Sequence, residues 1–187
     1  MVQTPAKSLT LEEFLKLPET KPASEYSDGQ ISQKPMPKAK HSAIQTELSS
    51  AINRVVKVKR VARAFSKLRC TFGRRSVVPD ISVFVWERIA RDNSGEVADK
   101  VSHPPDWTIE ILSPNQSISK VTKNILHCLA HETQMGWLID PKERVVFVYY
   151  ADRPTQFFDV AEQQIPIPDF ASEFRLTVAE LFGWLSD

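Results

Sequence analysis

Two stretches of the chain carry apolar residues at helical spacing. Between residues 41 and 56 the apolar positions recur at steps of three and four, and so do those between residues 118 and about 132. This period places the apolar side chains on one face of an α-helix. The pattern therefore predicts two long amphipathic helices.

Two shorter helices are indicated by their first residues. Thr10 and Glu13 have the spacing of a capping box, in which a hydroxyl and a carboxylate satisfy the free amides at a helix start, and Thr177 and Glu180 repeat it. Pro18 would end the first of these helices. We expect a short N-terminal helix and a terminal amphipathic helix.

Strands are predicted where β-branched and aromatic residues gather or alternate with polar ones. The segments are residues 61–72, 77–85, 107–112, 136–140 and 144–150, with a further short strand at 157–158. Asp28-Gly29 predicts a hairpin turn, with Glu25 on its first arm. Mixed in this order with the helices, the strands predict an α/β sandwich around one mixed sheet.

The length of 187 residues favours one domain spanning residues 1–187, with residues 1–9 disordered. Cys70 and Cys128 are the only cysteines, so a disulfide scaffold is excluded and both are predicted to pack inside the protein. The N-terminus has no signal-like apolar segment and no run is long enough to span a membrane. We expect a cytoplasmic protein without a membrane partner.

Charge is balanced overall and biased locally. Lys and Arg total 24 against 23 Asp and Glu, which gives a net charge of +1 and no global field for nucleic acid. Residues 54–75 nevertheless contain nine basic residues and no acid, whereas residues 87–99 are acidic. The basic segment could contact a phosphodiester substrate or could form a solvated helix face, and the sequence leaves both interpretations open.

Two carboxylates stand within apolar, β-prone runs. Asp80 follows Pro79 at the head of Ile-Ser-Val-Phe-Val, and Glu110 lies inside Trp-Thr-Ile-Glu-Ile-Leu. A buried carboxylate requires a metal ion or a cationic partner to offset its desolvation. The pair therefore predicts a metal site.

Each acid also has a simpler interpretation. Asp80 could cap a turn beside Pro79, and Glu110 could face solvent on a one-sided sheet. Glu25 could be a surface residue beside the hairpin. His41 begins a predicted helix, where surface placement is the usual outcome and a general base the less common one.

A metal site of this kind suits phosphodiester hydrolysis. Mg²⁺ or Mn²⁺ takes hard oxygen ligands, and such an ion polarises a phosphoryl oxygen and activates water. Asp80 and Glu110 would supply carboxylates, and the peptide carbonyl of Ile111 could complete the protein's share. Lys120 and Lys123 follow on the predicted helix and could orient the water or balance charge on the phosphate.

Several blocks together resemble a known family. Pro79-Asp80, the Glu110-Ile-Leu-Ser-Pro block and the Trp137-Leu-Ile-Asp-Pro block are similar to the Uma-two family of restriction-endonuclease-like proteins, in the PD-(D/E)XK nuclease superfamily. The resemblance implies a mixed central sheet flanked by helices. It also implies that Asp80 and Glu110 bind the metal and that Glu25 is an additional active-site acid.

The chain departs from the superfamily pattern at the lysine. The signature places lysine two residues after the acid, where this chain has Leu112. Family members commonly carry it on the following helix, at the position of Asn124 here, with Lys123 one step before. One helical step turns a side chain by about 100°. Lys123 or Lys120 could replace it, or the site could lack its lysine.

These observations lead to two functional hypotheses. The first is a Mg²⁺- or Mn²⁺-dependent DNA endonuclease in which Asp80, Glu110, Glu25 and Lys123 or Lys120 act. The second is a nuclease-fold protein that binds nucleic acid or a protein partner without cutting. An exposed apolar surface around Phe182, Trp184 and Leu185 would support a homodimer.

Overall fold

The computed structural model describes residues 9–114 and 116–186, so most of the segment expected to be disordered lies outside the described residues. No helix in these ranges is both long and apolar enough to cross a membrane. The elements, in chain order, are α1 (Leu11–Leu15), β1 (Ser24–Ser27), β2 (Gln30–Gln33), α2 (Ala39–Val56), β3 (Ala62–Ser66), β4 (Cys70–Phe72), β5 (Arg75–Val77), β6 (Ile81–Val85), η1 (Trp86–Arg88), β7 (Trp107–Ile111), α3 (Ile118–Leu129), β8 (Met135–Asp140), β9 (Val145–Tyr150), β10 (Gln156–Phe158), η2 (Asp169–Ala171) and α4 (Val178–Gly183).

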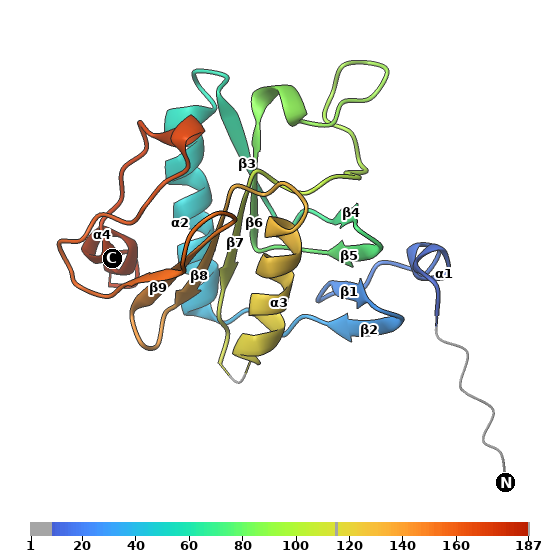
Figure 1. The fold of residues 1–187 in the computed structure, drawn as a ribbon, viewed down its shortest axis with the longest axis horizontal. Coiled ribbons are helices and arrows are strands. Elements are labelled where there is room, and N and C mark those ends of the chain that lie inside the picture. The colour runs from blue at the N-terminus through green and yellow to red at the C-terminus, as the bar shows by residue number, and fades with distance from the viewer. Residues whose placement is uncertain (1–8, 115, 187) are drawn as a thin grey trace, which may run out of the picture.

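The described strands form two sheets where the sequence predicted one. The larger sheet has the order β10-β9-β8-β7-β6-β3, and the smaller has the order β2-β1-β5-β4. The larger sheet is mixed, as predicted, because β7 and β8 run parallel while its other neighbours run antiparallel. In Figure 1 the smaller sheet stands to the right of α3, on the side away from β9.

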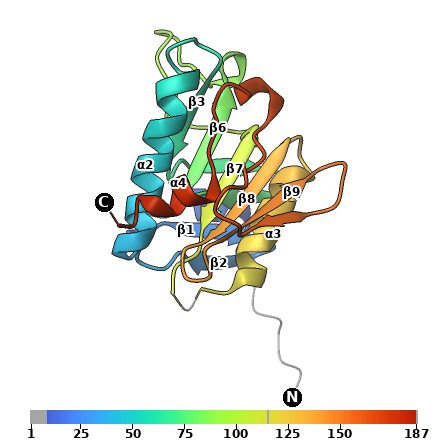
Figure 2. The ribbon, with the colours of Figure 1, turned by 90° about the vertical axis from the view of Figure 1, so that its left-hand side faces the viewer.

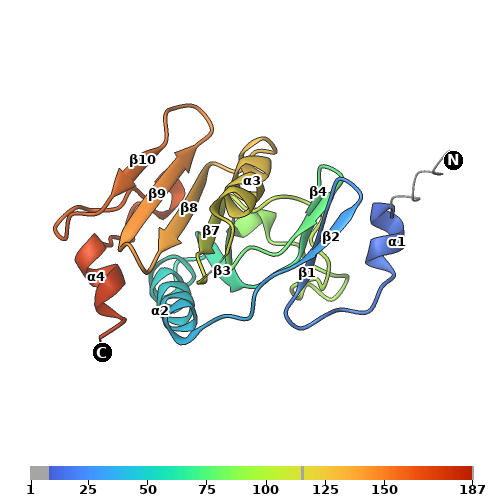
Figure 3. The same cartoon turned by 90° about the horizontal axis from the view of Figure 1, so that it is seen from below.

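Helices cover both faces of the larger sheet. Figure 3 shows α2 and α3 on opposite sides of β7 and β8, and Figure 2 shows α4 beside α2. The main core lies on the α2 side and contains Trp107 and Trp137, which meet edge to face with their ring centroids 4.8 Å apart. A smaller cluster, which includes Ile125 and Leu138, packs beneath α3. The mixed sheet flanked by helices is therefore confirmed.

The prediction of one strand over residues 77–85 is wrong, because the strand is interrupted just before the candidate metal ligand Asp80. β5 ends at Val77 in the small sheet and β6 begins at Ile81 in the large sheet. Pro79 has no N–H to donate and restricts the residue before it, so the ladder stops there and the chain changes sheets. Asp80 consequently stands at the head of β6 and not within a strand.

The predicted strand over residues 61–72 is divided in the same way. β3 belongs to the large sheet and β4 to the small one. Between them Lys67 has a φ of 52°. That left-handed backbone conformation turns the chain although the apolar-polar alternation continues through it.

The local signals at both ends of the chain are confirmed. Each capping box has both of its bonds, and α1 and α4 begin after Thr10 and Thr177. In the hairpin Ser27 pairs with Gln30, and Asp28 and Gly29 have φ values of 52° and 84°. Two successive positive φ angles define a type I′ turn, which fixes the register of β1 against β2.

The apolar surface expected for a homodimer is only partly exposed. Phe182 is buried, and Trp184 and Leu185 pack against the main core. A helix as short as α4 is stable only when its apolar face is covered, and this chain covers it with its own α2 side. Phe182 is therefore not available to a partner, whereas Trp184 and Leu185 are half-buried, and the homodimer stays a prediction.

Gly136 in β8 sets how closely α3 approaches the sheet. A Cβ at this position would overlap Cγ2 of Ile125, a fully buried residue of α3. We expect Gly136→Ala to lower the free energy of unfolding by about 1–3 kcal/mol, because the core must shift to accept the methyl group. Gly183→Ala is the matched control, since a Cβ there meets no atom within 4 Å. Urea unfolding of both variants checks this, and equal stabilities would contradict it.

Candidate active site

Asp80 is buried and held from three elements. Its Oδ2 accepts a hydrogen bond from the Ile111 amide of β7 at 2.9 Å. Its main-chain oxygen accepts one from the Gln45 side chain of α2 at 2.6 Å and one from the Lys67 amide at 3.1 Å. The sheet change at Pro79 thus leaves the carboxylate fixed at the start of β6.

Glu110 lies on β7 beside the neighbouring strand β6. Ile109 and Ile111 face the α2 side, so Glu110 points to the opposite face, toward α3. That face is covered, and Glu110 is 1% exposed. The solvent-facing alternative for Glu110 is therefore wrong.

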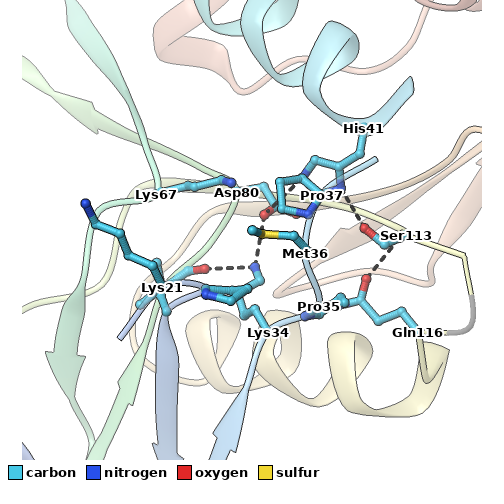
Figure 4. A pocket seen from close by; sticks show the side chains of 13 residues that line it. Lys21, Lys34, Pro35, Met36, Pro37, His41, Lys67, Asp80, Ser113 and Gln116 are labelled. Atoms are coloured by element: carbon cyan, nitrogen blue, oxygen red, sulfur yellow. Dashed lines mark hydrogen bonds and ion pairs between the residues drawn. The ribbon is translucent and has the colours of Figure 1, made fainter. Parts of the chain in front are cut away.

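Lys34 joins the two acids, although no role was predicted for it. Its Nζ lies 3.1 Å from Oδ1 of Asp80 and 2.8 Å from Oε2 of Glu110, and it also donates to the Val78 carbonyl at 2.8 Å. The Lys34 side chain is only 12% exposed. Figure 4 shows its ammonium pointing toward Asp80.

Glu25 borders the same site without an ion pair to Lys34. Its Oε1 accepts from the Val78 amide at 2.9 Å, and its Oε2 accepts from the Asn124 side chain of α3 at 3.0 Å. Glu25 is 5% exposed. Glu25 and Lys34 together therefore bind the N–H and the C=O of Val78, just before the sheet change.

His41, at the start of α2, is buried beside Asp80. Its Nε2 lies 3.4 Å from Oδ1 of Asp80, an ion-pair distance at which it makes no hydrogen bond. Its Nδ1 is 3.1 Å from the Ser113 hydroxyl, and the Ser113 amide donates to Gln116 Oε1. The serine of the Glu-Ile-Leu-Ser-Pro block thus positions the imidazole, and the surface interpretation of His41 is wrong.

Burial and charge act together on the pKa values here. Burial disfavours the charge of Lys34, but the surrounding carboxylates outweigh it and raise the pKa of Lys34. Burial also opposes the charge of Asp80, yet the cation and the N–H donors at its oxygens lower the pKa of Asp80. For Glu110 burial dominates, and the neighbouring acids add to it, so the pKa of Glu110 is raised despite Lys34.

Two pockets meet at Lys34. One, of about 380 Å³, is lined by Asp80 and His41, and Figure 4 shows Lys21 and Lys67 on its left and Ser113 and Gln116 on its right. The other, of about 310 Å³, shares Gln116 with the first and is also lined by polar residues that the first lacks: Glu25, Gln33, Glu110, Ser117, Lys120 and Asn124. Lys34 and Pro35 line both pockets. Asp80 therefore borders one pocket and Glu110 the other, and Lys34 borders both.

The two predicted lysines occupy different places. Lys120 lines the pocket that contains Glu110, whereas Lys123 lines a neighbouring pocket with Glu25 and without Glu110. Within the described part of the chain neither makes a side-chain hydrogen bond or ion pair. Of the basic segment 54–75, Lys67 lines the pocket of Asp80.

The carboxylate oxygens of Asp80 and Glu110 could supply part of the ligand shell of a hard divalent ion. Among residues 9–114 and 116–186, no three His, Cys, Asp or Glu side chains are grouped to hold a metal. Two carboxylates do converge, and Oε1 of Glu110 is buried without a hydrogen-bond partner. Mg²⁺ commonly takes one or two protein carboxylates and completes its shell with water and substrate. Asp80 and Glu110 satisfy that requirement.

A signal for Lys34 was present in the hairpin. With a two-residue turn at Asp28-Gly29, Glu25 pairs with Ser32, and Lys34 continues the ladder by donating its amide to the Ala23 carbonyl. Side chains two residues apart on a strand share a face. Glu25 and Lys34 therefore lie on one face of the hairpin, which the register alone could have predicted.

The fold and this site define a class of protein. A mixed sheet with helices on both faces, with one acid at the head of β6 and another in the neighbouring β7, is the architecture of a restriction-endonuclease-like nuclease. A family model described as "Putative restriction endonuclease" (Uma2) matches residues 11–179. The chain belongs to this Uma2 family, so the family resemblance is confirmed.

A solved structure supports the same class. The crystal structure of a protein from Anabaena variabilis ATCC 29413, described as a putative nuclease belonging to DUF820, is 63% identical to this chain with a TM-score of 0.93. The match covers 95% of this chain and 99% of that one. A comparison with curated proteins gives no match. The fold is thus that of a nuclease-like protein.

Glu25 offers a test of how the site is held together. Glu25→Ala would leave the Val78 amide and the Asn124 side chain without their acceptor. We expect the free energy of unfolding to fall by about 1–3 kcal/mol, because buried donors without partners lose their hydrogen bonds to water and gain none. Glu47→Ala, on the exposed side of α2, should change it little. Chemical denaturation of the three proteins checks this, and a Glu25→Ala variant as stable as the control would contradict it.

Proposed function

We propose that this protein is a Mg²⁺- or Mn²⁺-dependent endonuclease that hydrolyses phosphodiester bonds of DNA. The observation that carries the proposal is the convergence of Asp80 and Glu110 on one cation, with Oε1 of Glu110 buried and unpartnered. A divalent ion held there would polarise the phosphate and activate water. The family and the Anabaena structure support the nuclease class, and the metal and the activity belong to the proposal.

The residues around the acids have separate roles in this proposal. Asp80 and Glu110 would hold the ion, with the Ile111 carbonyl as a third protein oxygen. Glu25 would assist by fixing the Val78 amide next to the site. Of the two predicted lysines, Lys120 would contact a phosphate in the Glu110 pocket, because it lines that pocket, and Lys123 would contact the DNA backbone farther along α3.

DNA is the proposed substrate because lysines surround both pockets. Lys21 and Lys67 line the Asp80 pocket and Lys120 lines the Glu110 pocket. Cationic side chains around a carboxylate site attract a phosphate backbone that the acids alone would repel.

A homodimer would allow cleavage of both strands, and sedimentation at micromolar concentration would test it.

Cleavage of supercoiled plasmid with Mn²⁺ or Mg²⁺ is the direct test. We expect wild type to nick the plasmid and Asp80→Asn or Glu110→Gln to reduce the rate by about a hundredfold or more, since each removes a carboxylate ligand. Glu143→Gln changes an exposed acid and should keep the wild-type rate. Circular dichroism must show folded variants. Wild type that cuts no faster than Asp80→Asn would refute the proposal.

Binding to DNA can be tested without cleavage. In the presence of a chelator we expect Lys67→Ala and Lys120→Ala each to weaken binding of a short duplex, and to reduce the slope of log affinity against log salt by about one. Lys142→Ala removes an exposed lysine of the β8–β9 turn and should leave the slope unchanged. Fluorescence anisotropy over a salt series measures this, and unchanged slopes for both pocket variants would argue against the proposed DNA path.

A second candidate function is binding without cutting. It is favoured by Leu112, which occupies the signature lysine position and is buried against Val121 and Ile125 of α3. If Lys34 stays paired with Asp80 and Glu110, these carboxylates would bind no metal ion. The lysines around the pockets could still bind DNA. DNA binding without nicking, together with calorimetry that detects no Mn²⁺ binding, would support this candidate.

A further inference from the structure

The acidic cluster contains three buried carboxyl groups and one ammonium group. Asp80, Glu110 and Glu25 are buried around one ammonium, that of Lys34, and the His41 ring has no hydrogen bond at its Nε2. A buried carboxylate without a counter-charge is strongly disfavoured. The cluster therefore keeps a carboxyl oxygen, Oε1 of Glu110, that Lys34 does not satisfy and that another cation could bind.

Lys34 contacts the same groups that the proposed metal site would use. Its Nζ hydrogen-bonds one oxygen of Asp80 and one of Glu110, at 3.1 and 2.8 Å. If these carboxylates bound a divalent ion, the ion would lie within a few ångströms of the Lys34 ammonium. Like charges at that distance repel strongly in a buried site. A divalent ion and Lys34 would therefore compete for these two oxygen atoms.

The surroundings allow the side chain of Lys34 to move while its backbone stays. The amide of Lys34 is held by the Ala23 carbonyl, and Pro35 follows directly, so the main chain is fixed on both sides. Lysine has a flexible four-carbon stem, and Lys34 borders a pocket of about 380 Å³ and another of about 310 Å³. The ammonium can thus leave the acids without any change in the fold.

We propose that Lys34 is the resident cation of the metal-free protein, which a divalent ion displaces from Asp80 and Glu110 into one of the adjoining pockets. This inference rests on the metal site of the proposed function. It assigns to a hairpin residue an exchange that neither Lys120 nor Lys123 can perform, because neither contacts an acid in the described structure.

Lysine labelling of the wild-type protein tests the exchange directly. The protein is treated with formaldehyde and a borohydride reagent, with a chelator or with saturating Mn²⁺, and methylation of each lysine is followed by mass spectrometry. We expect Lys34 to be protected in the chelator and to be labelled about tenfold faster or more with Mn²⁺, because labelling requires an accessible amine. Lys142, whose side chain is 89% exposed, is the internal control and should be labelled equally in both.

Manganese binding by a variant gives a second, independent measurement. Lys34→Met removes the competing charge with little change in length, so calorimetry should show Mn²⁺ binding about tenfold tighter than in wild type. Mn²⁺ should also raise the melting temperature of Lys34→Met more than that of wild type. Lys38→Met, in the same linker but exposed, should behave as wild type.

The outcomes separate this inference from the proposed function. Equal labelling of Lys34 with and without bound Mn²⁺ would overturn it, even if the plasmid is cut. Absence of any Mn²⁺ binding to wild type and Lys34→Met would overturn it as well. Faster labelling of Lys34 with Mn²⁺ would support it even if no cleavage is found, and the endonuclease proposal alone would then fail.

Discussion

The ion pairs of Lys34 hold the two sheets together at the site. Lys34 follows β2 in the small sheet, while Asp80 directly precedes β6 and Glu110 lies in β7 of the large sheet. Removing one partner from a buried ion pair costs about 3–5 kcal/mol, whereas apolar residues of the same volume are often as stable or more so. Such a cluster is a poor means of gaining stability, so its presence points to chemistry at the sheet junction.

The sheet change at Pro79 gives the site its geometry. Asp80 is freed from a ladder at the point where β6 begins, and its side chain reaches the Ile111 amide next to Glu110. Gln45 of α2 and the Lys67 amide hold its carbonyl, so the turn is fixed from both directions. Because each contact comes from a different element, the acid is positioned only once the whole fold has formed.

Periodicity predicted the helices well, since α2 and α3 bury apolar residues at helical spacing and the capping residues mark α1 and α4. The two sheets could not be predicted in the same way. Alternation continues through Lys67 and through Pro79, and only the three-dimensional turn shows that the partners change there. The acids were found because charge is rare in apolar runs. Lys34 was missed because a lysine in a polar linker is ordinary, and Lys38 and Lys40 beside it have the same local appearance.

The departures from the superfamily pattern have a common physical explanation. Leu112 follows Glu110 on the α3 side of β7, and there it packs against Val121 and Ile125, where an ammonium would be buried among apolar groups. Asn124 on α3 donates to Glu25 and needs no charge to do so. With both positions neutral, the acids would lack a counter-ion unless another element supplied one, and the hairpin supplies Lys34. The register that puts Lys34 on the same face as Glu25 is thus coupled to the chemistry of residues 112 and 124, although the three positions lie on different elements.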